Sequence, residues 1–294
     1  MDQKIICFGE MLWDVLPTGK MPGGAPMNVA IHLHYQGFSP IVVSRVGSDE
    51  LGLDLLNFLK QKEVGTDWVQ VDEVHPTGTV DANVRDKQEV TYDIVQGVAW
   101  DYIQSEEALT QLVAQADALV YGSLVARSDI SRNTLAELLP QSRLRIFDVN
   151  LRAPHYSQNT VEPLLQQASI VKMNHHELEE IAGWYGEKGN EREQMALLKD
   201  RFDLQTVLVT RGAEGAAALS VDGYFEQEGI PVQVEDTIGS GDAFLASFLS
   251  GFFAELPLPE ILLHACAMGA HVATRKGATP LVDWKVVEQM IEEA

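Results

Sequence analysis

The sequence has few cysteines and few basic residues, and it contains no long apolar run. Its two cysteines, Cys7 and Cys266, are far apart and form no C-x-x-C pair, so we expect two buried thiols. Against 43 acidic residues there are only 21 basic ones, and the net charge of −22 disfavours nucleic acid and anionic membranes as partners. The longest apolar stretches, 243–254 and 261–273, are shorter than the roughly 20 residues of a membrane span.

Several familiar motifs are also missing. The apolar run Ile5–Phe8 is too short for a signal peptide, so we expect a cytoplasmic protein. Neither a G-x-x-x-x-G-K-[ST] phosphate loop nor a G-x-G-x-x-G fingerprint after the first apolar run is present, which disfavours phosphate-loop NTPases and NAD enzymes. A near match to the zinc motif H-E-x-x-H begins at His176, but Glu180 replaces its second histidine, so we expect no catalytic zinc.

Short apolar runs alternate with segments of helical spacing along most of the 294 residues. The runs lack polar alternation, as is typical of strands buried on both faces: Ile5–Phe8, Ile41–Ser44, Ala118–Tyr121, Leu144–Phe147, Ile170–Met173 and Val207–Val209. Two of the helical segments should end near Gly65 and at Pro140. The alternation predicts a three-layer α/β/α fold with a mostly parallel central sheet. No linker or repeat divides the chain, so we expect a single domain over residues 1–294.

One region breaks this alternation. Thr79–Val84 and Val90–Val95 are β-prone and flank a polar connection at 85–89, which predicts a hairpin with no helix after it. Leu12–Leu16 is also short and β-prone. We place these strands in a small sheet outside the main layers, made of residues 11–21 and 77–97. Its functional interpretation is a lid, and an ordinary edge hairpin is the alternative.

The segment from Asp236 to Asp242 carries the clearest chemistry. Gly239, Ser240 and Gly241 leave the start of an apolar helix without bulky side chains, so backbone N–H groups there can converge on a phosphate. Asp242 would lie in the first helical turn, where it can accept the proton of a substrate hydroxyl during phosphoryl transfer. A plain helix cap is the alternative interpretation.

A second glycine-rich segment also opens a helix. Gly23 and Gly24 permit close approach of a ligand, and Asn28 offers both a donor and an acceptor to hydroxyl groups. Asp14 lies between Trp13 and Val15, and a carboxylate in so apolar a strand would suit two sugar hydroxyls. A simple turn and a solvent-facing strand position are the respective alternatives.

Polar residues follow three predicted strands at their carboxyl ends, where ligands of open α/β sheets bind. Arg152 could contact the substrate or the transferring phosphate. Asn174 and Glu177 could orient Mg²⁺-bound waters and nucleotide phosphates, and Thr210 and Gly212 would suit nucleotide contact. Each of these residues alone could belong to a helix cap or a turn.

Taken together, the segments resemble the ribokinase-like (PfkB) carbohydrate kinases over nearly the whole chain. The landmarks occur in the family's order: Gly9-Glu10, Gly23-Gly24 with Asn28, Val46-Gly47-x-Asp49-x-x-Gly52, Asp148-x-Asn150-x-Arg152, Asn174-x-x-Glu177, Thr210-x-Gly212, Asp236-Thr237-x-Gly239-Ser240-Gly241-Asp242 and Thr274–Ala278. The first, second and fourth are similar to the fructokinase and 2-keto-3-deoxygluconate kinase branch. Departures from the family pattern are Ser240, where alanine is more usual, Met27 after Pro26, and the stretch after Arg152.

The resemblance implies a role for each site residue. Asp242 matches the catalytic base, and its own amide with Gly239, Ser240 and Gly241 matches the anion hole. Asp14, Gly24 and Asn28 match sugar-contacting positions. On the nucleotide side, Asn174 and Glu177 match contacts to ATP and Mg²⁺, and Thr210 and Gly212 match contacts to ATP. Asp236, Ile238 and the segment ending at Gly277 resemble a loop whose carbonyl oxygens hold K⁺.

We therefore expect an ATP-dependent sugar kinase, most simply a fructokinase, that uses Mg²⁺ and has a K⁺ site. A 2-keto-3-deoxygluconate kinase and a nucleoside kinase of the same fold are alternatives, and a degenerate sugar sensor is the non-enzyme alternative. Exposed apolar side chains on the small sheet would favour a homodimer joined through the lids. The side chains expected there are Trp13, Val84, Val90, Tyr92 and Ile94.

Overall fold

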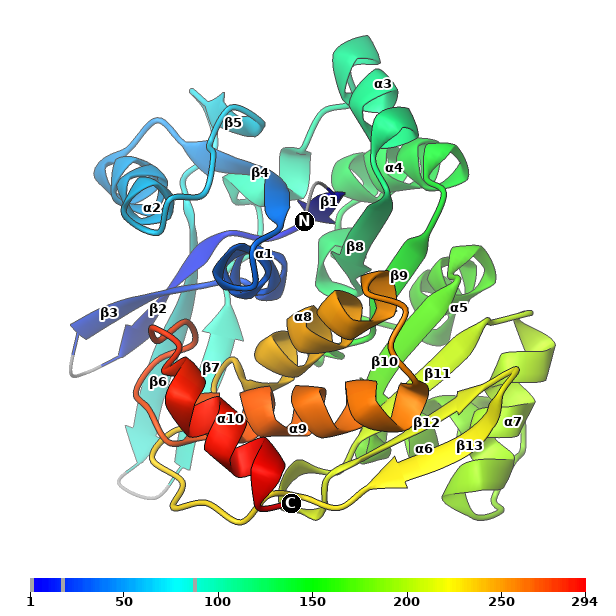
Figure 1. Ribbon diagram of the computed structural model, residues 1–294. Helices are drawn as coiled ribbons and strands as arrows, with labels where there is room; N and C mark the ends of the chain where they lie inside the picture. Colours follow the sequence, from blue (N-terminus) through cyan, green and yellow to red (C-terminus); the bar gives the residue numbers. More distant parts are fainter. Residues whose placement is uncertain (1–2, 17–18, 87–88) are drawn as a thin grey trace.

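The computed structural model describes residues 3–16, 19–86 and 89–294. In these residues the main element is a nine-stranded sheet of order β13-β12-β11-β10-β9-β8-β1-β4-β5 (Figure 1). Its strands are β1 (Lys4–Phe8), β4 (Ser39–Gly47), β5 (Val69–Asp72), β8 (Ala118–Gly122), β9 (Arg145–Asp148), β10 (Ile170–Asn174), β11 (Thr206–Thr210), β12 (Ala216–Ser220) and β13 (Gly223–Gln227). From β5 to β11 the neighbours run parallel, and β12 and β13 are antiparallel.

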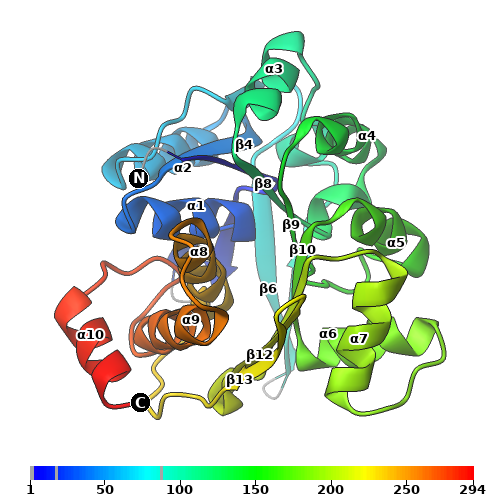
Figure 2. The same ribbon diagram turned by 45° about the vertical axis from the view of Figure 1, so that its right-hand side comes forward.

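Helices cover both faces of this sheet (Figure 2). One face carries α1 (Ala25–Tyr35), α2 (Glu50–Gln61), α8 (Ser240–Phe253) and α9 (Leu258–Ala273), with α10 (Trp284–Glu292) packed on α9. The other face carries α3 (Glu107–Gln115), α4 (Asp129–Leu138), α5 (Gln158–Gln167), α6 (His175–Trp184) and α7 (Glu191–Arg201). The predicted three-layer α/β/α architecture is confirmed. Among the described helices, none is long and apolar enough to cross a membrane.

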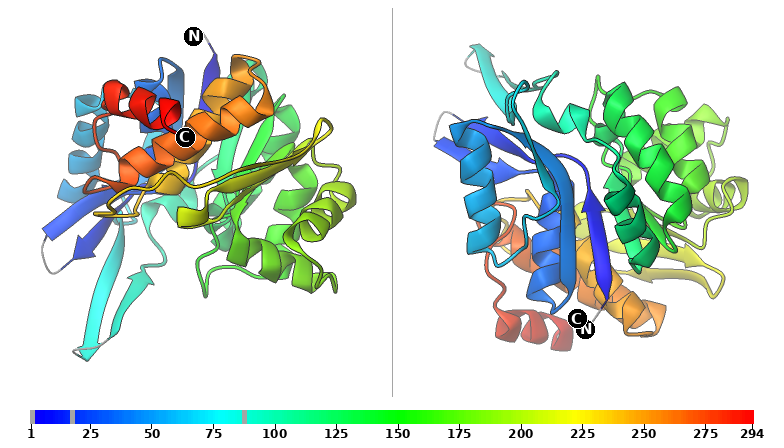
Figure 3. Two further views of the ribbon diagram at one scale, coloured as in Figure 1. Left: turned by 60° about the horizontal axis from the view of Figure 1, so that its bottom comes forward. Right: turned by 90° about the horizontal axis from the view of Figure 1, so that it is seen from above.

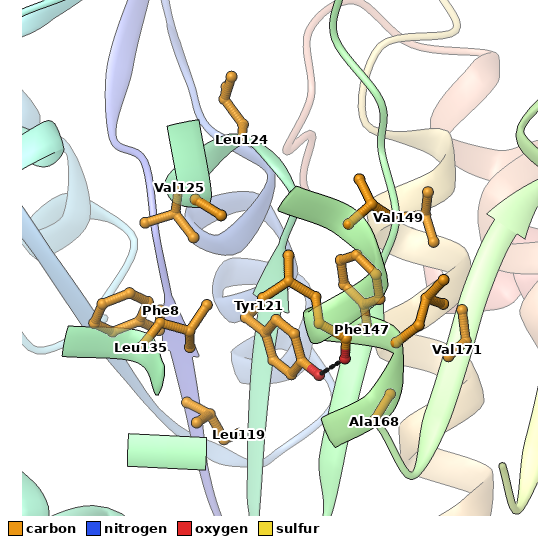
Figure 4. Packing of buried hydrophobic residues seen from close by; sticks show 14 of the residues in the cluster. Phe8, Leu119, Tyr121, Leu124, Val125, Leu135, Phe147, Val149, Ala168 and Val171 are labelled. Carbon is orange, nitrogen blue, oxygen red and sulfur yellow. Dashed lines mark hydrogen bonds between the residues drawn. The ribbon is translucent and has the colours of Figure 1, made fainter. Parts of the chain in front are cut away.

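The central strands are buried on both faces, which is why their sequences are continuously apolar. Phe8, Tyr121 and Phe147 lie side by side (Figure 4), are fully buried, and belong to one core cluster with Leu135 of α4 and Leu164 of α5. The one polar atom of this trio, the Tyr121 hydroxyl, donates to the Leu164 carbonyl at 3.0 Å, so no polar group is left unpaired there. Both cysteines are buried free thiols, as predicted.

A separate four-stranded sheet, of order β3-β2-β6-β7 in the described residues, projects from the side of the molecule as the blue and cyan strands in Figure 3. It comprises β2 (Leu12–Leu16), β3 (Gly19–Gly23), β6 (Gly78–Asp86) and β7 (Glu89–Ile94). The small sheet and the hairpin were predicted, but β3 was not, because Gly19–Gly23 has neither β-branched residues nor alternation. Residues 17–18, within the first predicted lid segment, and 87–88, within the predicted connection, lie outside the described residues.

The expectation of exposed apolar side chains on this sheet is wrong at two of the five positions. Trp13 is buried, and its indole N–H donates to the Leu51 carbonyl at 2.9 Å, so it packs against α2 of its own chain. Ile94 is also buried. The side chains of the remaining three positions, in β6 and β7, lie outside what the structure describes.

Three strands of the main sheet were not predicted. β12 is rich in alanine, β13 is only partly buried and β5 is a four-residue edge strand, so none shows a clear strand pattern. The helix expected to end near Gly65 ends at Gln61, because Glu63 adopts the left-handed conformation with φ of 59°. The Val64 amide then donates back to the Leu59 carbonyl at 3.0 Å.

Candidate active site

A cavity of about 410 Å³ lies where the carboxyl ends of β9, β10 and β11 face the small sheet. It brings together most of the side chains that the sequence singled out. The predicted residues that line it are Asp14, Gly23, Gly24, Asn28, Arg152, Asn174, Glu177, Thr210, Ile238, Gly239, Gly241 and Asp242. Four predicted residues do not line it: Gly212, Asp236, Ser240 and Gly277.

The start of α8 forms one wall of this cavity. Gly239 precedes the helix in the left-handed conformation, with φ of 79°, and no side chain caps the helix start. A Cβ at this position would lie 2.3 Å from the Ala278 carbonyl oxygen, so only glycine fits. The Ser240 amide donates to the Thr237 carbonyl at 3.2 Å, whereas no side chain occupies the amides of Gly239, Gly241 and Asp242. The helix dipole favours an anion at these amides. Ser240 does not line the cavity, and its Oγ is buried.

Asp242, the third residue of α8, projects from this first turn. Its Oδ2 accepts a hydrogen bond from the Asn28 amide of α1 at 2.8 Å. The carboxylate can be reached from the cavity but is otherwise enclosed by protein, and this burial, with the nearby charge of Asp148, raises its pKa to about 6. Asp242 is therefore mainly ionised at neutral pH, yet it is a stronger base than an ordinary aspartate.

Asp14 of β2 lines the cavity from the small sheet. Burial raises its pKa, and the positive charge of Arg152 opposes the shift. A Cβ on Gly23 would lie only 2.6 Å from the Asp14 Oδ2, so a larger residue at this position would displace the carboxylate. Gly24 is required for a different reason, because a Cβ there would lie 2.3 Å from the Glu10 carbonyl oxygen. Gly23 thus allows β3 to approach Asp14 of β2, and Gly24 allows the start of α1 to approach the backbone at Glu10.

The start of α6 is built differently from that of α8. Asn174 caps this helix by accepting from the Glu177 amide at 3.0 Å, and Glu177 accepts in return from the Asn174 amide at 2.8 Å. The second Glu177 oxygen accepts from the Leu151 amide at 2.8 Å. The alternative interpretation of these residues as a helix cap is therefore correct as far as their structure goes. Both also line the cavity, so capping does not exclude a contact with ligand.

These residues fit a magnesium ion only through water. Among residues 3–16, 19–86 and 89–294, no group of three His, Cys, Asp or Glu side chains could hold a metal ion directly. Each Glu177 oxygen keeps a second lone pair beyond its backbone contact, so it can still accept from a metal-bound water. Mg²⁺ commonly binds in this way, with phosphate oxygens and waters as most of its ligands.

Asp236 holds two loops together next to the start of α8. Its two carboxylate oxygens accept from the Ile238 amide at 3.0 Å and from the Gly277 amide at 3.1 Å. The Glu235 amide also donates to the Ala273 carbonyl at 2.8 Å. The residues predicted for a K⁺ site are thus brought together, and the Asp236 side chain is occupied by backbone amides.

Thr210 and Gly212 are separated by a residue that turns away from the cavity. Arg211 pairs with Glu191 and Glu226 in an open hollow of about 510 Å³ between the starts of α6 and α7 and strand β13. None of the predicted site residues lines that hollow. Thr210 remains at the cavity, and Gly212 begins the turn after it.

Comparison with known proteins shows the family of this chain. The profile described as "pfkB family carbohydrate kinase" matches residues 2–285. The chain belongs to the pfkB family of carbohydrate kinases. It is therefore a phosphotransferase that acts on a sugar hydroxyl, as the sequence predicted.

Curated relatives cover almost the whole of this pfkB kinase. It is 29% identical to the probable fructokinase-6 of Arabidopsis thaliana, over 96% of this chain and 80% of that protein. It is also 29% identical to the fructokinase of Salmonella typhimurium, over 95% of each chain. These similarities support the fructokinase branch of the ribokinase-like family.

Solved structures share the fold of the pfkB kinase. The fructokinase of Xylella fastidiosa with bound ATP superposes with a TM-score of 0.84 at 23% identity, covering 99% of this chain and 98% of that one. The fructokinase of Vibrio cholerae with fructose, ADP and calcium gives a TM-score of 0.83, also at 23% identity and 98% of this chain. At this identity the likeness concerns the fold.

Two charged residues at the cavity were not recognised as site residues from the sequence. Glu10, just after β1, is 3% exposed; its Oε1 accepts from the Ala25 amide at 3.2 Å, and Oε2 has no partner in the described part of the chain. Burial raises the pKa of Glu10 to about 7. Lys172 lies inside β10, where its side chain is 10% exposed and pairs with Asp148. A charged residue inside a strand predicted to be buried on both faces was the signal available for Lys172.

Proposed function

We propose that this pfkB kinase is an ATP-dependent fructokinase, which transfers the γ-phosphate of ATP to a hydroxyl of fructose. The observation that carries the proposal is the position of Asp242, a carboxylate with a raised pKa on the first turn of an uncapped helix, within a cavity lined by further hydroxyl-binding groups. The names of the curated relatives support fructose as the acceptor.

The sugar occupies the part of the cavity next to the small sheet. There the Asp14 carboxylate accepts from sugar hydroxyls, and Asn28 offers its amide to the sugar while it orients Asp242. Asp242 then takes the proton of the attacking hydroxyl as its oxygen approaches the γ-phosphorus. The small sheet acts as a lid that excludes water and so limits hydrolysis of ATP.

ATP enters from the side of Asn174, Glu177, Thr210 and Gly212. Its γ-phosphate is received by the backbone amides of residues 239–242, which offset the charge that spreads over the equatorial oxygens during transfer. Mg²⁺, held through water by Glu177, would neutralise charge on the nucleotide phosphates. Arg152 approaches the sugar or the transferring phosphate from the loop after β9.

Three further expectations belong to this proposal. K⁺ would be held by carbonyl oxygens of the two loops that Asp236 joins, beside the start of α8. The kinase would work in the cytoplasm, and it would form a homodimer through the small sheets. Light scattering at micromolar concentration tests the dimer, and a monomer would contradict it.

A panel of acceptors tests the proposed function. Fructose, 2-keto-3-deoxygluconate, ribose and adenosine are each supplied with ATP and Mg²⁺, and release of ADP is measured. We expect the highest kcat/KM with fructose. A higher value with 2-keto-3-deoxygluconate or adenosine would instead establish one of the two alternative kinases.

The sensor alternative gives a different pattern. A binding protein without activity would be stabilised by a sugar in thermal unfolding but would release no ADP with any acceptor. Every residue expected for catalysis is present, which favours the enzyme over the sensor. Stabilisation by fructose together with ADP release supports the kinase.

A further inference from the structure

Lys172 is placed where a transferring phosphoryl group is expected. It lies on β10, lines the cavity, and reaches the first turn of α8: a Cβ on Gly241 would lie 3.0 Å from the Lys172 Nζ. The ammonium group therefore sits against the backbone whose amides would receive the γ-phosphate. Only a glycine at 241 leaves room for it without a shift of the lysine.

The charges around the cavity show why a cation is needed at this point. Of the described residues that line it, Glu10, Asp14, Glu177 and Asp242 are acidic, and only Arg152 and Lys172 are basic. Such a lining repels the phosphates of a nucleotide unless a positive charge stands close to them. Arg152 is exposed, and its charge acts on Glu10 and Asp14 as well as on Asp242. Lys172 supplies the buried positive charge at the start of α8.

The hydrogen bonds of Lys172 leave it able to bind a ligand. Its Nζ donates to both oxygens of Asp148, at 2.9 and 3.1 Å. An ammonium group carries three hydrogens, so a third remains for an acceptor in the cavity. Burial alone would lower the pKa of Lys172, but the carboxylates of Asp148 and Asp242 raise it above its usual value, so the charge is kept.

We propose that Lys172 is a catalytic residue, which donates its third N–H to an equatorial oxygen of the phosphoryl group in transit, while Asp148 holds it in position. This inference rests on the proposed kinase function. In the step, a bond forms between the sugar oxygen and the γ-phosphorus, and the bond from that phosphorus to the β,γ-bridging oxygen breaks, with its electron pair leaving on ADP. The hydroxyl proton goes to Asp242, and Lys172 keeps its own protons.

In the alternative role, Lys172 is only a counterion to Asp148, and it affects catalysis only by changing the pKa of Asp242. Lys172 lowers the pKa of Asp242 and Asp148 raises it. Lys172→Met alone would therefore shift the acid limb of the pH profile upward, and it would also leave a buried carboxylate unpaired. The double variant Lys172→Met/Asp148→Asn removes both charges, so its acid limb should return close to that of the wild type.

The test compares the wild type, Asp148→Asn and the double variant. We expect kcat on the pH plateau to fall in that order, with the double variant about 10²–10³-fold below wild type, as when one donor to a developing oxyanion is removed. The dissociation constant for ADP, measured by calorimetry, should change less than about threefold, because the contact strengthens only during transfer. A double variant at least as active as Asp148→Asn would overturn the inference.

A second measurement does not depend on turnover. Aluminium fluoride added to ADP and fructose imitates the phosphoryl group in transit, and it should raise the unfolding temperature of the wild type beyond that with ADP and fructose alone. The double variant should lose this increment, and an undiminished increment would contradict the role of Lys172. A wild type inactive on every sugar would overturn the proposed function and this inference with it, whereas an active wild type with an equally active double variant would overturn this inference alone.

Discussion

Helices α8 and α6 both begin at the same cavity, yet their starts are built in opposite ways. At α8 the capping residue is Gly239, which has no side chain to occupy the amides of the first turn. At α6, Asn174 and Glu177 form a reciprocal capping box that occupies amides with side-chain oxygens. The first start is open to an anion, and the second is already satisfied within the protein.

The difference shows how two helix starts at one cavity can serve different purposes. An uncapped start leaves N–H donors for a group with changing charge, such as a phosphoryl group in transit. A capped start instead holds its own residues by hydrogen bonds, and in the proposed role Glu177 would orient water from this fixed position. The helix starts should therefore respond differently to substitution: changes at α8 should affect kcat most, and changes at α6 should affect stability and nucleotide affinity.

The largest effect is expected from Asp242→Asn at the open start. The amide keeps the shape of the carboxylate but cannot take a proton, so kcat should fall by about 10²–10⁴-fold. The dissociation constant for ATP, measured by calorimetry, should stay nearly unchanged. A folded variant with near-normal turnover would remove Asp242 as the base and with it the mechanism.

A second effect concerns the shape of the open start. Gly239→Ala would place a Cβ 2.3 Å from the Ala278 carbonyl oxygen and would strain a left-handed residue, so the amides should shift. We expect kcat/KM for ATP to fall about 10²-fold and the free energy of unfolding to fall by about 1–3 kcal/mol. Urea denaturation and steady-state kinetics measure the two losses.

Gly37→Ala provides the matched control for this variant. Gly37 has a similar φ of 84°, but a Cβ there meets no atom within 4 Å, and it lies far from the cavity in the loop after α1. It should lose stability through backbone strain and keep its activity. Equal losses of kcat/KM in the two variants would mean that the effect at Gly239 is one of general stability.

A smaller effect is expected from pH. Asp242 has a pKa of about 6, and the proposed base must be ionised to take a proton, so kcat/KM for the sugar should fall as the pH drops through 6. At pH 5 the loss should be roughly tenfold, because about one tenth of the carboxylates remain ionised. Circular dichroism at pH 5 checks that the chain stays folded. A profile that is flat from pH 8 to pH 5 would contradict the assigned base.

The sequence predicted most of what depends on local pattern. The parallel strands were visible as uninterrupted apolar runs, and the open start of α8 was visible because Gly239, Ser240 and Gly241 precede an acid and an apolar helix. β5, β12 and β13 were missed because their pairing at the two ends of the sheet is decided by tertiary contacts, which propensity does not encode.

Residues at the cavity were missed for the same reason, because their contacts depend on tertiary pairing. Lys172 and Asp148 are 24 positions apart, and only the parallel pairing of β9 with β10 puts them together. The contact between Asn28 and Asp242 spans 214 positions and joins two helices of one layer. For Asn174 and Glu177, the spacing fitted both a cap and a ligand contact, and both interpretations remained open until the hydrogen bonds and the cavity were known together.

The smallest effect should come from the capped start, and a second capping box in the same chain makes it measurable. Asn190 and Glu193 cap α7 with the same reciprocal hydrogen bonds, at 3.0 and 2.9 Å, and do not line the cavity. Asn174→Ala and Asn190→Ala should each lower the free energy of unfolding by about 1 kcal/mol. If Asn174 also holds the nucleotide side in place, only its variant should raise KM for ATP, by several-fold. Equal KM values would mean that α6 serves stability alone, because the same loss of a cap would then have the same consequence at the cavity and away from it.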